Sequence, residues 1–359
     1  MIRTRYGLVV EVRARQGLQE CLVRSEGSEH AALNLESVLG AVSPGERVLL
    51  NTTAVDLGLG TGGYHLVMAR CPQPDRDSRG PGHLIKLRYS PWQIRVTSCE
   101  EAGGQGHEVL REAHSLDLMP VVCCGLHSQV LACLLALARL APGLSVAYVV
   151  NDAGCLPIGL SRGLASLRQG ELDLTVITAG HAFGGDLEAV NVHSALLAAR
   201  HVSDARVAVV GMGPGVAGTG TFMGHSEIRQ GEDLNAAAGL GGIPLAVPRI
   251  SEGDPRSRHR GISHHTLAVL GRAALAPALV VLPHAGSDRA RRWRRQLESW
   301  NIPDRHTLLW LDPVPADRVL AGAEILSTMG RGWSSEPWFF RAAGLAGAVA
   351  ALMAGGASR

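Results

Sequence analysis

The sequence predicts an α/β protein in which a small N-terminal β-barrel precedes a Rossmann-like, doubly wound parallel sheet. Residues 5–70 contain short apolar segments separated by turn-forming residues, which is typical of an all-β region. From residue 119 onward, apolar segments of strand length alternate with helical stretches, the pattern of βαβ units. These segments end abruptly in Gly, His, Asp or Arg, so polar chemistry should gather at the carboxyl edge of the sheet. We therefore expect two domains, residues 1–118 and residues 119–359.

The N-terminal region has enough strands to close a small barrel of the OB-like or SH3-like kind. Ser43–Glu46 predicts a tight turn, and the proline- and glycine-rich segment Cys71–Gly82 predicts a linker or exposed loop. Two further strands, Leu84–Tyr89 and Gln93–Thr97, should follow it. The five expected barrel strands are Gly7–Arg13, Gln19–Val23, His30–Leu35, Arg47–Asn51 and Tyr64–Ala69.

In the C-terminal region, right-handed crossovers between parallel strands should place helices on both faces of the sheet. The expected strands are Met119–Cys124, Val146–Val150, Leu174–Thr178, Val207–Val210, Ile243–Val247, Leu279–Leu282 and Thr307–Leu311, with an edge strand at Glu324–Leu326. The expected helices are Ser128–Leu140, Leu156–Arg168, Leu187–His201, Gly231–Ala238, Ser263–Ala273 and Ser287–Trp300.

Composition limits the classes of function. The chain has 359 residues, 46% of them apolar and 18% charged, which describes a globular protein with a sizeable core. Lys86 is the only lysine. A P-loop, which needs Gly-Lys-Ser/Thr, is therefore excluded, and a pyridoxal phosphate site is effectively excluded because Lys86 precedes the sheet. The net charge of +2 gives no sign of a nucleic-acid partner, and the basic run Arg289–Arg295 is explained by a solvated helix face.

No feature of the sequence indicates secretion or membrane insertion. Seven cysteines without a CxxC pair predict neither a disulfide framework nor a zinc ribbon. The N-terminal residues Met1–Tyr6 lack the apolar core of a signal peptide. The apolar tail Ala342–Gly356, about 15 residues long, is shorter than the roughly 20 residues that span a bilayer. We expect a cytoplasmic protein without a membrane partner. The sequence is compatible with a homo-oligomer.

The segment Gly211–Gly220 follows an expected strand directly and is rich in glycine. Glycine lets a backbone approach a ligand closely, and a helix that begins beyond it would offer free N–H groups to an anion. We expect a phosphate or carboxylate cradle; a turn that packs a helix on a strand is the alternative. A dinucleotide site is disfavoured, because the next strand ends in Val247-Pro248-Arg249 rather than in an acidic residue. The expected ligand-binding residues are Gly211, Gly213, Gly215, Gly218, Thr219 and Gly220.

Residues 253–265 form the densest polar segment of the chain. Ser263 is a good N-cap for the next helix, and the two histidines after it would lie where backbone donors depress the pKa of histidine. Arginine suits the recognition of carboxylates and phosphates. A solvated surface loop is the alternative. We expect His264 and His265 to be catalytic, and Asp254, Arg256, His259 and Arg260 to bind the ligand.

Other polar residues follow other strands of the expected sheet. We expect Asp152, His181 and Asp186 to be catalytic and His127 to bind the ligand. Imidazoles and carboxylates that meet at one edge can form an acid/base pair or hold a divalent metal. Their spacing matches no metal motif such as HExxH, and for each residue a helix cap or an ordinary hydrogen bond is the alternative. From their shared position we expect His127, Asp152, His181, Gly213 and His264 to converge in one pocket.

Several long stretches resemble one family. They are Leu50–Gly63, Gly180–Ala189, Met212–Gly215 with Gly218–Thr221, Arg260–Thr266 and Ser327–Gly332. In these stretches the chain resembles DUF3866, a family of uncharacterised bacterial proteins. The resemblance implies no activity, because the family name records none. Asn151–Ala153 departs slightly from the family's pattern.

Together these patterns predict an enzyme, a hydrolase or a transferase, that acts on a small anionic molecule at the carboxyl edge of the sheet. His264 or His181 would be the general acid or base, and Asp152 and Asp186 would orient it or hold a divalent metal. Arg256 and the segment Gly211–Gly220 would bind the anion. The alternative is a sensor or scaffold that binds a nucleotide or metabolite without turnover.

Overall fold

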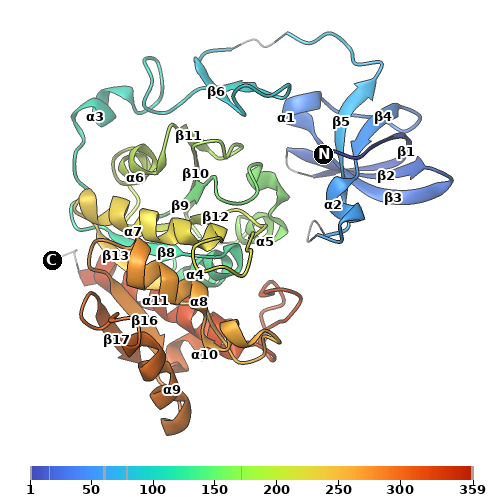
Figure 1. Cartoon of the computed structure of the whole chain (residues 1–359). Coiled ribbons are helices and arrows are strands. Elements are labelled where there is room, and N and C mark those ends of the chain that lie inside the picture. Colours follow the sequence, from blue (N-terminus) through green and yellow to red (C-terminus); the bar gives the residue numbers. More distant parts are fainter. Residues whose placement is uncertain (1, 16, 60–61, 78–79, 171, 357–359) are drawn as a thin grey trace. The chain divides into compact units, whose positions relative to one another are not determined.

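The computed structural model describes residues 2–15, 17–59, 62–77, 80–170 and 172–356 (Figure 1). It divides into two compact units, Met1–Pro81 with Ile85–Val96, and Gly82–Leu84 with Thr97–Arg359. Residues 97–118, which the sequence analysis assigned to the N-terminal domain, belong to the second unit. Two backbone hydrogen bonds hold them there, from Cys99 to Glu188 and from Leu116 to Leu240. Gly60 and Thr61, in the first stretch that resembles the family, lie outside the described residues.

The first unit contains the expected closed barrel, with strands in the order β1-β2-β3-β5-β4. β1 pairs with β4 antiparallel and β3 pairs with β5 parallel, the strand order of an OB-like barrel. Alternate residues such as Val23, Val48 and Leu50 point inward and form its core. The strands are β1 (Thr4–Arg15), β2 (Leu18–Ser25), β3 (Ser28–Leu35), β4 (Arg47–Asn51) and β5 (His65–Cys71), with short helices α1 (Glu36–Leu39) and α2 (Thr53–Asp56). A small sheet of β6 (Leu84–Lys86) and β7 (Ile94–Val96) follows in the chain.

The second unit is built on an eight-stranded, all-parallel sheet in the order β11-β10-β9-β12-β8-β13-β16-β17. Every residue of β8, β9 and β12 is buried, which explains their continuous apolar sequences. The strands are β8 (Pro120–Cys124), β9 (Val146–Asn151), β10 (Leu174–Ala179), β11 (Leu187–Ala189), β12 (Val207–Met212), β13 (Ile243–Val247), β16 (Leu279–Pro283) and β17 (Thr307–Leu311). β14 (Ile250–Ser251) and β15 (Gly261–Ile262) form a separate antiparallel pair.

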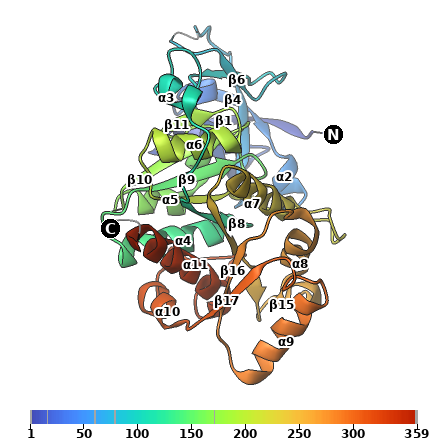
Figure 2. The same cartoon turned by 90° about the vertical axis from the view of Figure 1, so that its left-hand side faces the viewer.

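Helices cover both faces of this sheet, so the fold is doubly wound as predicted (Figures 1 and 2). One face carries α6 (Val192–His201), α7 (Arg229–Gly239), α8 (His264–Ala268) and α9 (Ser287–Glu298). The other carries α4 (His127–Leu140), α5 (Arg162–Leu167), α10 (Val314–Leu320) and α11 (Pro337–Gly356). The short helix α3 (His107–Glu112) precedes β8, and α8 runs directly into a π-helical turn, Val269–Ala273.

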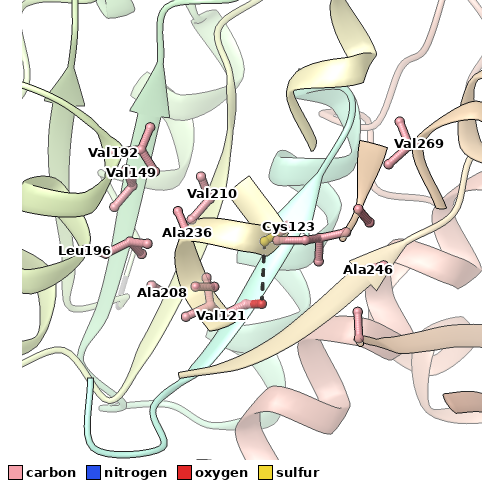
Figure 3. Close-up of a cluster of buried hydrophobic side chains, with 14 of the residues drawn as sticks. Val121, Cys123, Val149, Val192, Leu196, Ala208, Val210, Ala236, Ala246 and Val269 are labelled. Atoms are coloured by element: carbon pink, nitrogen blue, oxygen red, sulfur yellow. Dashed lines mark hydrogen bonds between the residues drawn. The ribbon is translucent and has the colours of Figure 1, made fainter. Parts of the chain in front are cut away.

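The side chains of β8 alternate between two apolar layers. Figure 3 shows Val121 and Cys123 in the layer that contains α6 and α7, next to Ala208 and Val210 of β12. Val122 and Cys124 point into the opposite layer, against α4 and α11. Both faces of the sheet are therefore filled with apolar side chains, and polar chemistry is confined to the ends of the strands.

Three predicted elements differ in the structure. The segment predicted as the helix Leu156–Arg168 contains a 3-10 turn, Ile158–Leu160, and α5 begins only at Arg162. The segment predicted as the helix Leu187–His201 begins as the edge strand β11, and α6 starts only at Val192. The side chain of Asn191 caps α6 by accepting a hydrogen bond from the backbone N–H of Ser194. Glu324–Leu326, predicted as an edge strand, is not a strand.

The apolar C-terminal helix is also longer than its sequence suggested. α11 begins at Pro337, and by length and composition alone it could cross a membrane. However, Ala343, Ala346 and Ala350 are fully buried against the sheet and α4, and the Cys133 thiol donates to the Ala343 carbonyl at 2.9 Å. α11 is thus a core helix of the second unit, a conclusion that rests on burial and not on length.

The contact between α11 and α4 requires a small residue at Gly347. A Cβ atom there would lie 2.9 Å from the Cys133 carbonyl oxygen, whereas a Cβ at Gly355 of the same helix meets nothing within 4 Å. Gly347→Ala should therefore lower the free energy of unfolding by about 1–3 kcal/mol, as overpacking does, despite the better helix propensity of alanine. Gly355→Ala should leave it unchanged or raise it slightly. Equal urea midpoints for the two variants would contradict this packing.

Candidate functional site

The sheet has a topological switch point between its adjacent strands β8 and β12. The chain leaves β8 through α4 on one face toward β9, and it leaves β12 through α7 on the other face toward β13. In open α/β sheets ligands bind at such a point, outside the carboxyl ends of the strands. Next to this point, glutamine amides bridge the ends of β8 and β13: Gln230 Nε2 donates to the carbonyls of Cys123 and Val247, and Gln129 Oε1 accepts from Gly125.

Four histidines gather beside this crevice, on the segments that follow β12 and β13. His225 stacks on His265 with a ring separation of 3.8 Å, and His264 lies 4.3 Å from His265. His259 lies 4.9 Å from His264 and 4.8 Å from His265. His225, His259 and His265 are buried and His264 is partly exposed. We call these four residues the histidine cluster.

A buried network of charged groups underlies the histidine cluster. Glu227 Oε1 lies 2.6 Å from both Arg249 Nη1 and His265 Nδ1. Arg249 Nη2 reaches Asp254 at 3.5 Å, and both oxygens of Asp254 accept hydrogen bonds of 2.9 Å from Arg256. Glu227, Arg249 and Asp254 are almost completely buried, so each charge depends on its partners. We call this group, completed by Ser251, Arg331 and Glu336, the ionic network.

Burial sets the protonation of the cluster. It is the largest cause that lowers the pKa of His225 to about 4, of His264 to about 4 and of His259 to about 3. The neighbouring His265 lowers the pKa values of His225 and His264 further, and Arg249 lowers that of His259. Burial alone would raise the pKa of Glu227, but Arg249 and His265 hold it below its ordinary value. Around pH 7 these three imidazoles are therefore neutral beside a charged carboxylate.

Several nitrogens of the histidine cluster lack partners among the residues that the structure describes. Neither ring nitrogen of His225 makes a hydrogen bond of normal geometry, although the Phe222 carbonyl approaches the ring, and His264 Nε2 is likewise buried without a partner. A buried polar atom left in this state costs about 1–3 kcal/mol. One nitrogen each from His259, His264 and His265 lie within 4.8 Å of one another, so these three residues could hold a metal ion. The site thus combines imidazole nitrogens that have no hydrogen-bond partner with the buried carboxylate of Glu227.

The glycine-rich segment folds over the histidine cluster as a hairpin. Gly218 and His225 form an antiparallel bridge, and the Thr219 N–H donates to the Gly224 carbonyl at 2.8 Å. A Cβ at Gly218 would lie 3.7 Å from His265 Nε2. The exposed tip is held where Phe222 stacks on Trp300 at 4.5 Å. We call residues 217–226 the glycine hairpin.

The first part of the expected anion-binding segment Gly211–Gly220 is packed against other backbone and is not accessible to a ligand. Gly211 and Gly213 are buried, and a Cβ at Gly213 would lie 2.5 Å from the Cys155 carbonyl oxygen. No helix begins directly beyond Gly220, since α7 starts only at Arg229. Gly215 is exposed with a φ of 100°, which glycine adopts freely. The glycines of this segment therefore divide into a packed turn and the hairpin.

The structure brings together most residues that were expected in the histidine-rich segment. His259, His264 and His265 form the cluster, Asp254 and Arg256 belong to the ionic network, and Arg260 Nε donates to the Asp254 carbonyl. Gly218, Thr219 and Gly220 lie in the hairpin above. Because its guanidinium is bound to the Asp254 carboxylate, Arg256 is part of the ionic network, whereas Arg258 and Arg260 have no carboxylate partner in the described chain.

The other expected residues lie in separate surroundings. His127 Nε2 lies 2.6 Å from Ser161 Oγ, its Nδ1 lies 3.3 Å from the Tyr148 hydroxyl, and burial lowers its pKa to about 4. Asp152 accepts from the His181 backbone N–H at 3.0 Å and pairs with Arg229 at 3.5 Å. Asp186 is bound by Arg168 and by the Val176 N–H. Of the five residues expected in one pocket, Asp152 and His181 contact each other, whereas His127, Gly213 and His264 each contact other residues.

Sequence reasoning missed His225, Glu227, Arg249 and Arg258. Only the position of His225 and Glu227 behind the glycine segment, and of Arg249 directly after a strand, could have signalled them. It also missed Asp233 on α7, whose Oδ2 accepts from Asn151 at 2.7 Å. Burial, opposed by Arg229, raises the pKa of Asp233 to about 7.

A cavity of about 770 Å³ lies at the opposite, amino edge of the sheet, where β8 and β13 begin. Met353 and Ala354 of α11 line it, together with the Asp117–Arg200 ion pair at 3.4 Å. None of the residues expected in the site lines it. Since its charged pair is neutralised and no histidine or cysteine faces it, we assign it no chemistry.

The chain belongs to the family described as "Protein of unknown function (DUF3866)", whose model matches residues 31–347. No curated protein and no solved structure matches the chain. The family description assigns no activity, so any argument about function must come from the geometry of the site.

Asp233 should make stability depend on pH. Its folded pKa of about 7 exceeds the ordinary 3.8, so the folded protein keeps a proton that the unfolded chain releases. The free energy of unfolding should therefore fall as pH rises from about 4 to 7, by about 4 kcal/mol at most. Asp233→Asn should gain stability relative to the parent chain over this window. Denaturant titrations at several pH values measure the difference, and parallel stability curves would refute the assignment.

Removing Arg249 should leave Glu227 buried with an uncompensated charge. Arg249→Met should lower the free energy of unfolding by about 3–5 kcal/mol, the usual effect of breaking a buried pair. The double variant Arg249→Met with Glu227→Gln removes both charges, so it should recover part of this loss. Chemical denaturation of the three proteins tests both steps. A loss below about 1 kcal/mol for Arg249→Met would mean that water reaches Glu227.

Proposed function

We propose that the protein is a hydrolase that acts on a small anionic molecule at the histidine cluster, in the cytoplasm. The observation that carries this proposal is the buried cluster itself: four imidazoles with unpartnered nitrogens beside the switch point of a parallel sheet. Most buried polar groups in native proteins are hydrogen-bonded, so a group of neighbouring imidazole nitrogens without partners calls for an explanation. Strongly perturbed side chains that gather in this way are typical of catalytic sites.

The cluster is suited to accept a proton from water. His225 is neutral around pH 7 because burial lowers its pKa to about 4, and neither ring nitrogen makes a hydrogen bond of normal geometry within the described residues. We assign the role of proton acceptor to His225. Its stacking partner His265 is fixed by Glu227 at 2.6 Å, so the ring that supports His225 cannot turn freely.

The anion would bind to the arginines that the ionic network leaves available. Arg258 is exposed, makes no ion pair within the described ranges, and lies 3.9 Å from the position of a Cβ at Gly220 in the hairpin. Its charge is felt in the cluster, because it contributes to the low pKa of His264. A guanidinium beside exposed hairpin N–H groups recognises carboxylates and phosphates. We therefore place the anionic group of the substrate between Arg258 and the glycine hairpin.

The cysteines support the cytoplasmic part of the proposal. All seven are free, and five of them are buried. Cys124 and Cys133 lie 3.8 Å apart as thiols, and burial raises the pKa of Cys124 well above its ordinary value. Reduced thiols in close proximity are typical of a reducing compartment.

Gly218 provides the variant that tests this site. A Cβ at this position makes ordinary contacts with His265, so the fold should accept a side chain, but the methyl groups of valine would cover Nε2. Gly218→Val should lower kcat/KM at least about tenfold, equivalent to about 1.4 kcal/mol, with an unchanged melting temperature. Ala217→Val, at an exposed position one residue away, is the matched control.

The assay uses a panel of phosphomonoesters, phosphodiesters, nucleotides, lactones and N-acyl amino acids. Turnover of one class, reduced by Gly218→Val and not by Ala217→Val, would support the proposal. Binding of a panel member without turnover would instead indicate a sensor. If a hydrolysed substrate were processed equally by both variants, the chemistry would lie elsewhere in the protein.

A further inference from the structure

We infer that His259, His264 and His265 form a binding site for one divalent transition-metal ion of the zinc type. The inference concerns the same cluster as the proposed function, but it rests on the positions of nitrogen atoms and does not require turnover. Three imidazoles on a short segment, from residue 259 to residue 265, supply the donor set. Three protein nitrogens that leave a further position open are typical of catalytic zinc sites.

The spacing of the nitrogens is close to that of a metal centre. One nitrogen from each ring lies within 4.8 Å of the other two. Tetrahedral zinc with Zn–N bonds of about 2.0–2.1 Å would separate its ligand nitrogens by about 3.3 Å. The three atoms therefore need to approach by about 1.5 Å or less, which small rotations of the imidazole rings provide. His264 Nε2 is already buried and without a partner in the described structure, as an uncoordinated ligand would be.

Separate hydrogen bonds orient the rings of His265 and His259. His265 Nδ1 lies 2.6 Å from Glu227 Oε1, and His259 Nδ1 lies 2.8 Å from Ser263 Oγ. Each contact occupies Nδ1, and a proton on Nδ1 leaves the lone pair of Nε2 available to a metal; neither Nε2 has a hydrogen-bond partner in the described parts of the chain. Metal-binding histidines almost always use their second nitrogen in this way, often toward a carboxylate. Glu227 is fixed in turn by Arg249 at 2.6 Å.

Ser263 connects this arrangement to the local fold. It is the N-cap of α8, where its Oγ accepts from the His265 backbone N–H at 3.2 Å. The same oxygen contacts His259, four residues earlier, because β14 and β15 pair and return the chain to the start of α8. One hydroxyl therefore positions two of the three ligands. This explains why the ligands need not follow a helical HExxH spacing.

The donor set also indicates which ion would bind. Imidazole nitrogens favour zinc, copper, nickel and iron, whereas magnesium and calcium prefer carboxylate and carbonyl oxygens. The nearest carboxylate, Glu227, is already hydrogen-bonded to His265 and Arg249, so it orients a ligand and does not coordinate. His225 contacts the rings of His264 and His265 and is not one of the three residues whose nitrogens converge. We therefore expect one Zn²⁺ per chain, with Co²⁺ as a spectroscopic substitute.

The test is metal binding by the full chain, prepared without a histidine tag. The protein is stripped with a chelator and titrated with ZnCl₂ in calorimetry and with CoCl₂ in visible absorption. We expect one equivalent of Zn²⁺, and a cobalt spectrum of tetrahedral intensity. His264→Ala should weaken Zn²⁺ binding at least about 100-fold, and Glu227→Gln should weaken it about 10–100-fold, as the loss of a partner behind a metal ligand does. His193→Ala removes an exposed histidine on α6 and should bind like the parent chain.

Each result decides the inference. Absence of stoichiometric Zn²⁺ binding, or equal affinity in His264→Ala and His193→Ala, would overturn it. Glu227→Gln guards against misfolding of His264→Ala, because glutamine keeps an oxygen acceptor for His265; if His264→Ala is unfolded, the Glu227→Gln titration alone decides. Zinc binding without turnover of any substrate would refute the proposed function and leave the metal site standing. Turnover by a chain that binds no stoichiometric Zn²⁺ would refute the metal site and leave the proposed function standing.

Discussion

The site depends on one buried contact, the Glu227–Arg249 ion pair. Glu227 follows β12 and Arg249 follows β13, so the pair joins two segments that no backbone hydrogen bond of the sheet connects at that point. Desolvation of both charges is unfavourable, and it is tolerated only where every remaining donor and acceptor finds a partner. Asp254 and His265 provide those partners. The positions of the histidines follow from this requirement, since a displaced loop would leave a charge unpaired inside the protein.

The need to pair these buried charges also explains where the histidine cluster lies relative to the switch point. Gln129 and Gln230 bridge the ends of β8 and β13 with side-chain amides, and Glu227 Oε2 would lie 3.5 Å from a Cβ at Gly125. These side chains therefore occupy the space directly above the ends of β8 and β13. The histidine cluster lies one layer farther out, between this polar filling and the glycine hairpin. The sheet determines where the site lies, and the ionic network places the rings of the histidine cluster farther from the strand ends.

The sequence predicts the fold and the local parts of the site, but not its long-range pairings. The strands β8, β9, β12, β13 and β16 follow from their apolar runs, and His259, His264 and His265 stand close together in one segment. Glu227 and Arg249 are 22 residues apart, and their pairing depends on tertiary structure alone. The neighbouring arginines 256 and 258 look equivalent in sequence, yet only the first is bound to Asp254. Asp186 likewise follows a strand but turns toward Arg168.

Three stretches that carry the family resemblance meet around the cluster. Gly218–Thr221 forms the hairpin, Arg260–Thr266 supplies two histidines and their cap, and Ser327–Gly332 contributes Arg331 to the ionic network. Arg331 reaches both Glu336 and Asp254, which links the start of α11 to the loop after β13. Unpartnered imidazoles among buried charged groups are unfavourable in a core that serves only packing. Their meeting at one place therefore favours a binding or catalytic role for the whole arrangement.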